Sequence, residues 1–147
     1  MAKKSSTPTF VLELPLVVTK GNERIILARL EAGRRLYNAT LHEALKRLSI
    51  MRSSVEWQSA RDLPKGKDRN EAFKAVNEHF GFSEYALHDF VKPVRINAGW
   101  KDRLSAQEAQ KIASRVFKAV SEYAFGARGK PRFKGINRPL HSLEGKQ

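Results

Sequence analysis

The chain has 147 residues, of which 41% are hydrophobic, and its 28 Lys and Arg against 15 Asp and Glu give a formal charge of +13. This content suits one domain with a core, or a small domain with an insertion, and weighs against global disorder. So large a positive excess indicates a polyanionic partner, nucleic acid before an anionic membrane, and the absence of cysteine excludes disulfides and thiolate zinc sites.

Residues 1–20 are expected to form a basic leader and a first strand. Residues 10–18 are rich in β-formers and lie between Pro8 and Gly21. Pro15 removes one donor from a ladder, which favours an edge position or a bulge. The run is too short to span a bilayer and contains Glu13. We therefore expect a cytoplasmic protein with no membrane partner, and a strand that pairs elsewhere in this chain or on another chain.

Residues 21–126 have the periodicity of a helical bundle. Asn22 is the expected N-cap of the first helix, and apolar residues then recur at steps of three and four from Leu27 to Leu48, which marks one buried face. Gly33 inside this helix costs about 1 kcal/mol against Ala. It either admits a neighbouring backbone or is a tolerated imperfection. The helix continues or resumes as far as Leu63.

Local signals divide the rest of the bundle. Gly81 and Gly126 are expected to end helices, and Pro93 to kink or interrupt one. One serine N-cap and two capping boxes, each an acceptor followed three residues later by Glu, predict the starts. These starts are Asp68 with Glu71, Ser83, and Ser105 with Glu108. We expect four or five helices.

Residues 127–147 lose the helical period and carry a row of cations without an acid among them: Arg128, Lys130, Arg132, Lys134 and Arg138. The first four stand at every second position, so in an extended segment they project from one face. Such a row suits the phosphates of a nucleic-acid strand, and Phe133 either packs inward or offers a stacking plane. A solvated basic tail is the alternative.

The order of these elements predicts an α+β fold that is mainly α. A bundle of four to five helices over residues 21–126 is inserted between an N-terminal strand in residues 1–20 and short C-terminal strands in residues 127–147. The C-terminal strands are expected at 132–134 and 140–143. Together with the first strand they would form part of a β-barrel.

Catalytic chemistry is not indicated. The four histidines lack metal-ligand spacing, and neither a phosphate-binding loop nor a nucleophile elbow is found. We therefore expect no catalytic residue, no metal site, no cofactor and no enzyme activity. Binding chemistry remains, because Arg and Lys contact phosphates and aromatic rings stack on bases. Tyr37 lies on the apolar stripe of its helix, which favours core packing over base stacking.

Two stretches resemble a known family. Residues 32–41, Ala-Gly-Arg-Arg-Leu-Tyr-Asn-Ala-Thr-Leu, are similar to the Arg-x-x-Tyr-Asn-x-x-Leu pattern near the N-terminus of TnpB-like proteins. These are transposon-encoded RNA-guided nucleases related to type V CRISPR effectors. Residues 129–134, Gly-Lys-Pro-Arg-Phe-Lys, with Ser142 after them, resemble the Gly-x-Pro-x-Phe-Lys … Ser segment that follows in that family at matching spacing.

The resemblance implies a wedge β-barrel with an inserted helical recognition lobe. In the family these regions hold the guide RNA scaffold, the guide–target heteroduplex and the DNA motif beside the target. Structured guide RNA and double-stranded DNA are thus the implied partners, in a prokaryotic cytoplasm. The resemblance assigns Arg34, Arg35, Tyr37 and Asn38 to the recognition lobe, and Arg128, Lys130, Arg132, Phe133 and Lys134 to the returning wedge segment.

The family's nuclease domain and zinc ribbon lie further along, and this chain reaches Gln147 before either. We therefore expect a truncation, a stand-alone recognition module, or one half of a split protein that docks on a second chain carrying the nuclease part. A generic double-stranded-DNA-binding protein is the alternative function.

Overall fold

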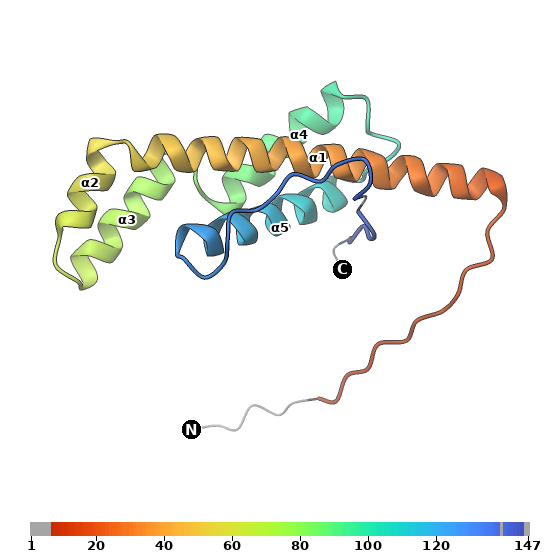
Figure 1. Cartoon of the computed structure of the whole chain (residues 1–147), viewed down its shortest axis with the longest axis horizontal. Coiled ribbons are helices and arrows are strands. Elements are labelled where there is room, and N and C mark those ends of the chain that lie inside the picture. The colour runs from red at the N-terminus through yellow and green to blue at the C-terminus, as the bar shows by residue number, and fades with distance from the viewer. Residues whose placement is uncertain (1–6, 139, 146–147) are drawn as a thin grey trace.

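One long helix organises the molecule in the computed structural model, which describes residues 7–138 and 140–145. The described part contains five helices: α1 Lys20–Arg52, α2 Val55–Asp62, α3 Lys67–His79, α4 Glu84–Asn97 and α5 Ala106–Ala124. Helices α4 and α5 pack beside the middle of α1, while α2 and α3 form a hairpin at its C-terminal end (Figure 1). The predicted bundle is confirmed, with five helices.

Helix α1 begins earlier than predicted, and of the two interpretations for the stretch up to Leu63 the structure has the resumed helix. The Thr19 hydroxyl accepts the N–H of Asn22 at 3.2 Å, which makes Thr19 the N-cap and leaves Asn22 within the first turn. Helix α1 ends at Arg52, and the Ser54 hydroxyl caps α2 by accepting the N–H of Trp57 at 3.1 Å. Two adjacent serines separate the two helices, because their hydroxyls compete for backbone groups.

The serine starts of the last two helices are confirmed. Ser83 accepts the N–H of Ala86 at 3.1 Å and caps α4. Ser105 and Glu108 form the complete capping box of α5, with each side chain bonded to the other residue's backbone N–H, at 3.1 and 2.9 Å. Gly126, at a φ of +77°, follows the end of α5 as predicted.

Two local features differ from those predicted: the capping box at Asp68 is absent, and α4 is not interrupted at Pro93. Helix α3 begins at Lys67 with Gly66 as its N-cap, so Asp68 lies in the first turn and forms no side-chain cap. Pro93 lies inside α4, which continues to Asn97 without interruption. Pro93 is exposed, so water can take the carbonyl bond that the missing proline N–H leaves open.

The core lies between α1, α4 and α5. The apolar stripe of α1 is buried from Ala32 to Met51, as its three- and four-residue steps predict, but Leu27, at the predicted start of the stripe, is 57% exposed. The largest fully buried side chains come from these three helices and from the turn before α5: Leu36, Leu41, Leu87, Val91, Leu104, Ile112, Val116 and Val120. Burial of these side chains supplies the main stabilisation of the bundle.

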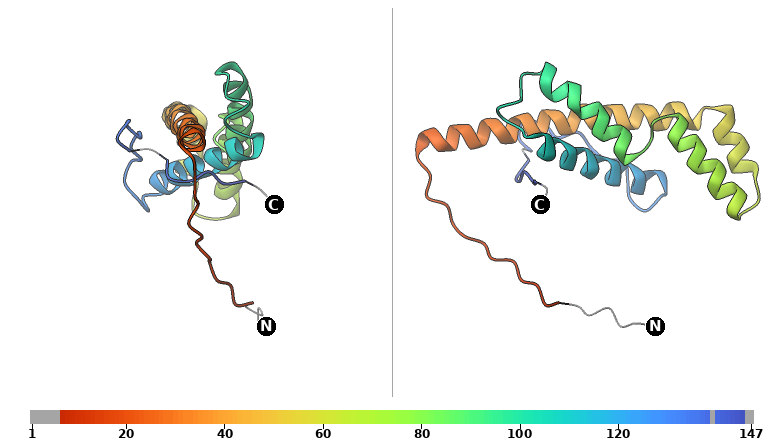
Figure 2. Two further views of the ribbon diagram at one scale, coloured as in Figure 1. Left: turned by 90° about the vertical axis from the view of Figure 1, so that its right-hand side faces the viewer. Right: turned by 180° about the vertical axis from the view of Figure 1, so that it is seen from behind.

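The predicted first strand is wrong. Residues 7–19 are extended but form no ladder, and they leave the bundle without touching it (Figure 2). Apolar side chains of this segment, among them Phe10, Leu14 and Val17, are exposed. The residues favour a strand, but a strand needs a neighbour to bond its backbone, and the described part supplies none. Residues 1–6 of the expected leader lie outside the described residues.

The predicted C-terminal strands are also wrong, so the α+β fold with a partial β-barrel is replaced by an all-helical fold in the described residues. Neither 132–134 nor 140–143 forms a strand. The tail, which we define as residues 127–138 and 140–145, instead returns along α1 in the opposite direction (Figure 1). The backbone of Lys134 bonds to side chains of α1 and the carbonyl oxygen of Ser142 accepts from a side chain of α5, so these groups have partners outside a strand ladder.

Candidate nucleic-acid interface

The tail is fixed to α1 by a side-chain amide. Asn38 donates from Nδ2 to the carbonyl oxygen of Lys134 and accepts the N–H of Lys134 at Oδ1, both at 2.8 Å. Arg34 adds a bond from Nη1 to the same carbonyl oxygen, also at 2.8 Å. We call these three residues the latch. The latch therefore joins the two stretches that carry the family resemblance, which lie 96 to 100 residues apart in sequence.

An acid one turn earlier holds Arg34 in place. Arg34 forks onto the Glu31 carboxylate with bonds of 2.8 and 2.7 Å, and Arg35 adds a bond of 3.0 Å. The hydrogen bond from Arg34, helped by Arg35 and opposed by desolvation, lowers the pKa of Glu31 from its ordinary 4.5 to about 2. The Arg34 side chain is only 11% exposed. Arg34 and Asn38 thus hold the tail on α1, and the nucleic-acid contact expected of them stays a prediction.

The other two predicted residues of α1 differ in exposure. Arg35 is 62% exposed and is held only by its bond to Glu31. Tyr37 is half-buried against the core, and Lys134 places its Nζ 5.0 Å from the ring centroid. Burial raises the pKa of Tyr37, with Arg128 acting in the opposite direction. The core packing predicted for Tyr37 is confirmed, and the outer part of the residue also faces the tail.

The end of the tail packs onto Gly33. A Cβ at this position would lie 2.9 Å from Cδ1 of Leu140 and 3.0 Å from Cδ2 of Leu143. Gly33 therefore admits a close neighbour, as one of the two sequence interpretations held, but the neighbour is a pair of side chains and not a backbone. On α5, Arg115 donates to the carbonyl oxygen of Ser142 at 3.3 Å.

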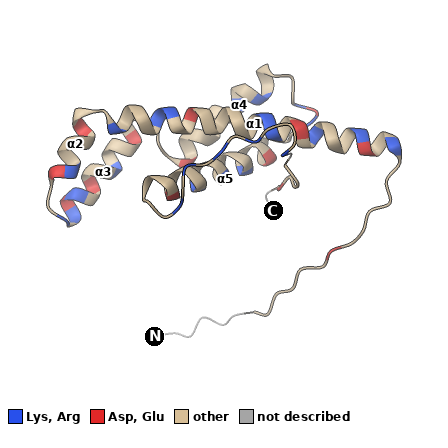
Figure 3. Cartoon of the chain, viewed as in Figure 1, with Lys and Arg blue, Asp and Glu red and all other residues tan. Residues whose placement is uncertain are grey.

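Between the latch and α5 the tail forms an open basin of about 570 Å³, which we call the basic basin. Tyr37 contributes from α1, and no acid lines the basin. Pro131 is buried and Phe133 is 51% exposed. Five cations line the basin, all exposed except the half-buried Lys134: Arg128, Lys130, Arg132, Lys134 and Arg138. Figure 3 shows these basic residues following the tail across the face of the bundle.

Only one of the exposed basin cations forms an ion pair within the described residues. Arg128 lies 3.6 Å from Glu122, and both side chains are largely exposed. Such a surface pair contributes about 0–1 kcal/mol, so a phosphate can replace the carboxylate at little cost. The basin therefore presents charge-assisted donors that are free to meet an anion.

Sequence reasoning missed the residues that position the tail. Glu31 was not singled out, although its spacing to Arg34 and Arg35 is that of helical ion pairs. Arg115 and Lys111, which pair with Glu144 at 3.6 and 3.8 Å, were missed because no local pattern links them to the tail.

Comparison with protein-family models finds no match, and comparisons with curated proteins and with solved structures find none either. In the described ranges, none of the helices has the length and apolar content that a bilayer crossing needs. The same ranges contain no group of three or more acidic or histidine side chains arranged to hold a metal ion.

Proposed function

We propose that this chain is a nucleic-acid-binding module that holds structured RNA on the basic basin. The observation that carries the proposal is the set of five cations around one acid-free basin. Lys and Arg bind phosphate oxygens with charge-assisted bonds, and each phosphate bound releases counterions from the nucleic acid. Phe133 is exposed enough to stack on an unpaired base.

The latch supports this proposal through preorganisation. A free basic tail loses conformational entropy when it binds, whereas a tail already bonded to Asn38 and Arg34 has lost much of it beforehand. The solvated tail that the composition allows has no backbone bonds of this kind. Fixed spacing of the cations also favours one strand geometry over others, which suits a structured RNA.

The resemblance to TnpB-like proteins adds a more specific proposal. The two similar stretches meet at the latch, so their order and separation along the chain have a physical reason. We propose that the chain corresponds to the non-catalytic front part of such a nuclease, with guide RNA as its main ligand and target DNA as a second. The proposal does not include a β-barrel.

The generic DNA-binding alternative places one helix of the bundle in a major groove, with Arg34 and Arg35 of α1 reading bases. Arg34 is bonded to Glu31 and Lys134, which leaves it few free donors for a base edge, whereas Arg35 is 62% exposed and bonds to Glu31. The five cations of the basic basin therefore favour the basin over this face of α1, which offers one exposed arginine of the two.

A second candidate function is docking on another protein chain, such as one that carries the nuclease part. The supporting observation is that residues 10–18 expose every apolar side chain, because exposed apolar stretches of this size mark interaction sites. Replacing Leu12, Leu14 and Leu16 with Ser should then abolish copurification of one defined protein and leave RNA binding intact. A wild-type chain that purifies alone as a monomer would argue against this function.

Ultraviolet crosslinking in the native host tests the main proposal. Crosslinked RNA would be sequenced, and the crosslinked peptides identified by mass spectrometry. We expect one enriched structured RNA and crosslinks within residues 128–138. Bulk cellular RNA without enrichment, or crosslinks confined to other helices, would contradict the proposal.

A further inference from the structure

A second hollow lies away from the basic basin, among the C-terminal half of α1, the α2–α3 hairpin and the end of α5. Its volume is about 520 Å³ and most of its lining is apolar or aromatic. Trp57 and Phe73 meet edge to face there, with ring centroids 6.2 Å apart, and Phe125 is 84% exposed where α5 ends. We call this hollow the hairpin cavity. Its size and its aromatic walls suit a small planar ligand.

The charge of the hairpin cavity selects an anion. Arg52, Arg69 and Lys74 line it, and no Asp or Glu does. The Nε atom of Arg69 is buried and has no hydrogen-bond partner in the described residues, and the guanidinium lies 5.4 Å from the centroid of the Phe73 ring. A buried N–H without an acceptor is unfavourable. An anionic oxygen of a ligand is the acceptor that would satisfy it.

Uncharged polar groups narrow the ligand further. Asn70, Asn77 and Ser121 line the same cavity and offer both donors and acceptors. Asn70 is exposed and Asn77 and Ser121 are half-buried, so the polar edge of a nucleobase finds donors and acceptors there that the alkyl chain of a fatty acid would not use. A flat ring with a polar edge and an attached phosphate matches the whole lining.

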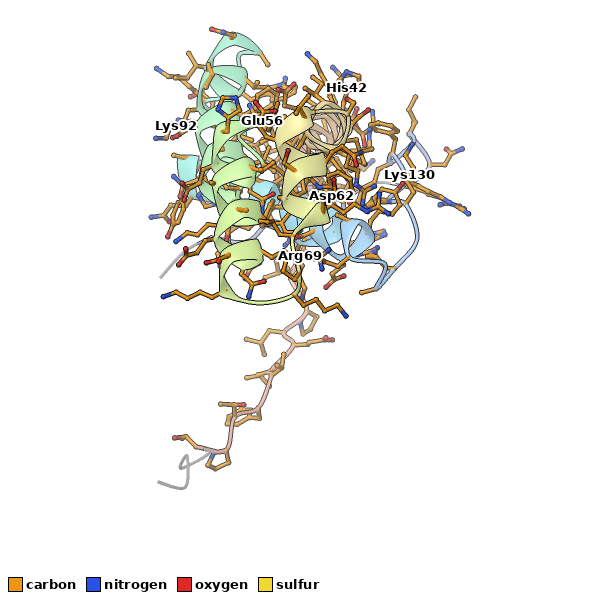
Figure 4. All side chains as sticks on the ribbon, turned by 90° about the vertical axis from the view of Figure 1, so that its left-hand side faces the viewer. His42, Glu56, Asp62, Arg69, Lys92 and Lys130 are labelled. Carbon is orange, nitrogen blue, oxygen red and sulfur yellow. The ribbon has the colours of Figure 1, made fainter. Side chains whose placement is uncertain are left out.

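The hairpin cavity is connected to the basic basin through shared residues. Lys130 lines both the basin and a smaller hollow of about 260 Å³, and Arg52 lines both that hollow and the hairpin cavity. Figure 4 shows Arg69 at the hairpin and Lys130 on the tail, in separate parts of the end view. Arg52 is itself held in place by a bond of 3.0 Å to the carbonyl oxygen of Ala124. A strand on the basin can therefore follow cations towards the cavity.

We propose that the hairpin cavity binds an unpaired nucleotide, with its base against the aromatic lining that includes Trp57 and Phe73 and its phosphate at Arg69 and Lys74. A free nucleotide and an unpaired nucleotide of an RNA strand share this chemistry. Only the second source rests on the proposed function, because it requires the strand to lie on the basic basin.

Tryptophan fluorescence tests the proposal in the full chain. The variant Trp100→Phe leaves Trp57 as the sole tryptophan. It is titrated with adenosine and uridine monophosphates, with inorganic phosphate, and with a single-stranded RNA oligomer. The nucleotides and the oligomer should quench Trp57, and phosphate alone should not. Adding Arg69→Gln should weaken nucleotide binding about tenfold, whereas Lys65→Gln, which removes a charge from the neighbouring turn outside the cavity, should not.

A basin variant separates the two proposals. Replacing Arg128, Lys130, Arg132 and Arg138 with Gln should leave mononucleotide binding unchanged and weaken oligomer binding. Unchanged oligomer binding in this variant would contradict the basic basin and leave the cavity standing. Quenching by mononucleotides but not by the oligomer would identify free nucleotide as the source. The cavity proposal is overturned if millimolar nucleotide does not quench Trp57, or if inorganic phosphate alone displaces the nucleotide as well as another nucleotide does. It is also overturned if the variants Arg69→Gln and Lys74→Gln bind nucleotide as tightly as Lys65→Gln does.

Discussion

At the scale of single residues, the tail is positioned by the Asn38 amide, which uses one donor and one acceptor to bond the C=O and the N–H of the same residue, Lys134. Replacing Asn38 with Ala removes both bonds without changing the charge. We expect a loss of about 1–2 kcal/mol in the free energy of unfolding and faster tryptic cleavage within residues 128–138. Urea unfolding and timed proteolysis measure the two effects.

Asn97→Ala is the matched control, because Asn97 is exposed at the end of α4. Its tail should be cleaved at the wild-type rate. Equal cleavage rates in Asn38→Ala and Asn97→Ala would show that the latch does not hold the tail.

Glu31 gives the latch a dependence on pH. Its pKa is about 2 in the folded chain against an ordinary 4.5, since Arg34 and then Arg35 donate to its carboxylate. A lowered folded-state pKa stabilises the protein above the unfolded pKa, and this contribution is lost as the pH falls from 4.5 towards 2. The stability difference between wild type and Glu31→Gln should therefore shrink over this range. The urea midpoints of both chains at about pH 6, 4 and 3 measure this stability difference. A difference that stays constant with pH would contradict the lowered pKa of Glu31.

At the scale of elements, the helix starts differ in what they contribute to stability. Ser105 satisfies a backbone N–H of α5, so Ser105→Ala should cost about 1 kcal/mol. Asp68 caps nothing in α3, and Asp68→Ala should cost less than about 0.5 kcal/mol. Thermal unfolding of both variants checks the contrast. Equal losses of stability in the two variants would mean that the capping box of α5 stabilises the protein no more than a single acid in the first turn of a helix does.

The helices could be predicted from the sequence because their signals are local. Ser83 and Ser105 bond to N–H groups within three residues, and the apolar stripe of α1 repeats within one turn. Local signals could not predict whether residues 10–18 pair as a strand. Its residues favour extended backbone, and residues 7–19 are extended, but a strand also depends on a neighbouring backbone that no local pattern reveals.

The cations of the candidate site could be predicted, but the roles of Arg34 and Asn38 could not. Cations at every second position identify the row from Arg128 to Lys134 from the sequence alone. By contrast, the partners of Arg34 and Asn38 lie about a hundred residues away. The family resemblance assigned both residues to the recognition lobe that holds nucleic acid. In the structure both donate to the chain's own tail, a contact that no local pattern reveals.

At the scale of the whole molecule, the charge of +13 does not by itself locate a binding site, because cations are spread over all five helices and the tail (Figure 3). The basic basin differs from the other basic surfaces in that five cations, all from the tail, surround one acid-free hollow, whereas three cations line the acid-free hairpin cavity. If phosphates bind there, removing these cations should weaken binding more than removing the same charge elsewhere. A generic polycation would respond equally to both changes.

The most direct test is the salt dependence of RNA binding by three chains. These are the wild type, the basin variant with Arg128, Lys130, Arg132 and Arg138 changed to Gln, and a control with Lys20, Arg24, Lys92 and Lys101 changed to Gln. The control residues are exposed on α1, on α4 and in the turn after it, and each variant loses the same charge. The affinity for one structured RNA is measured from low to physiological salt. The slope of log affinity against log salt is negative. We predict that it becomes shallower by about 3 in the basin variant and changes little in the control. Equal slopes in the two variants would contradict binding at the basic basin.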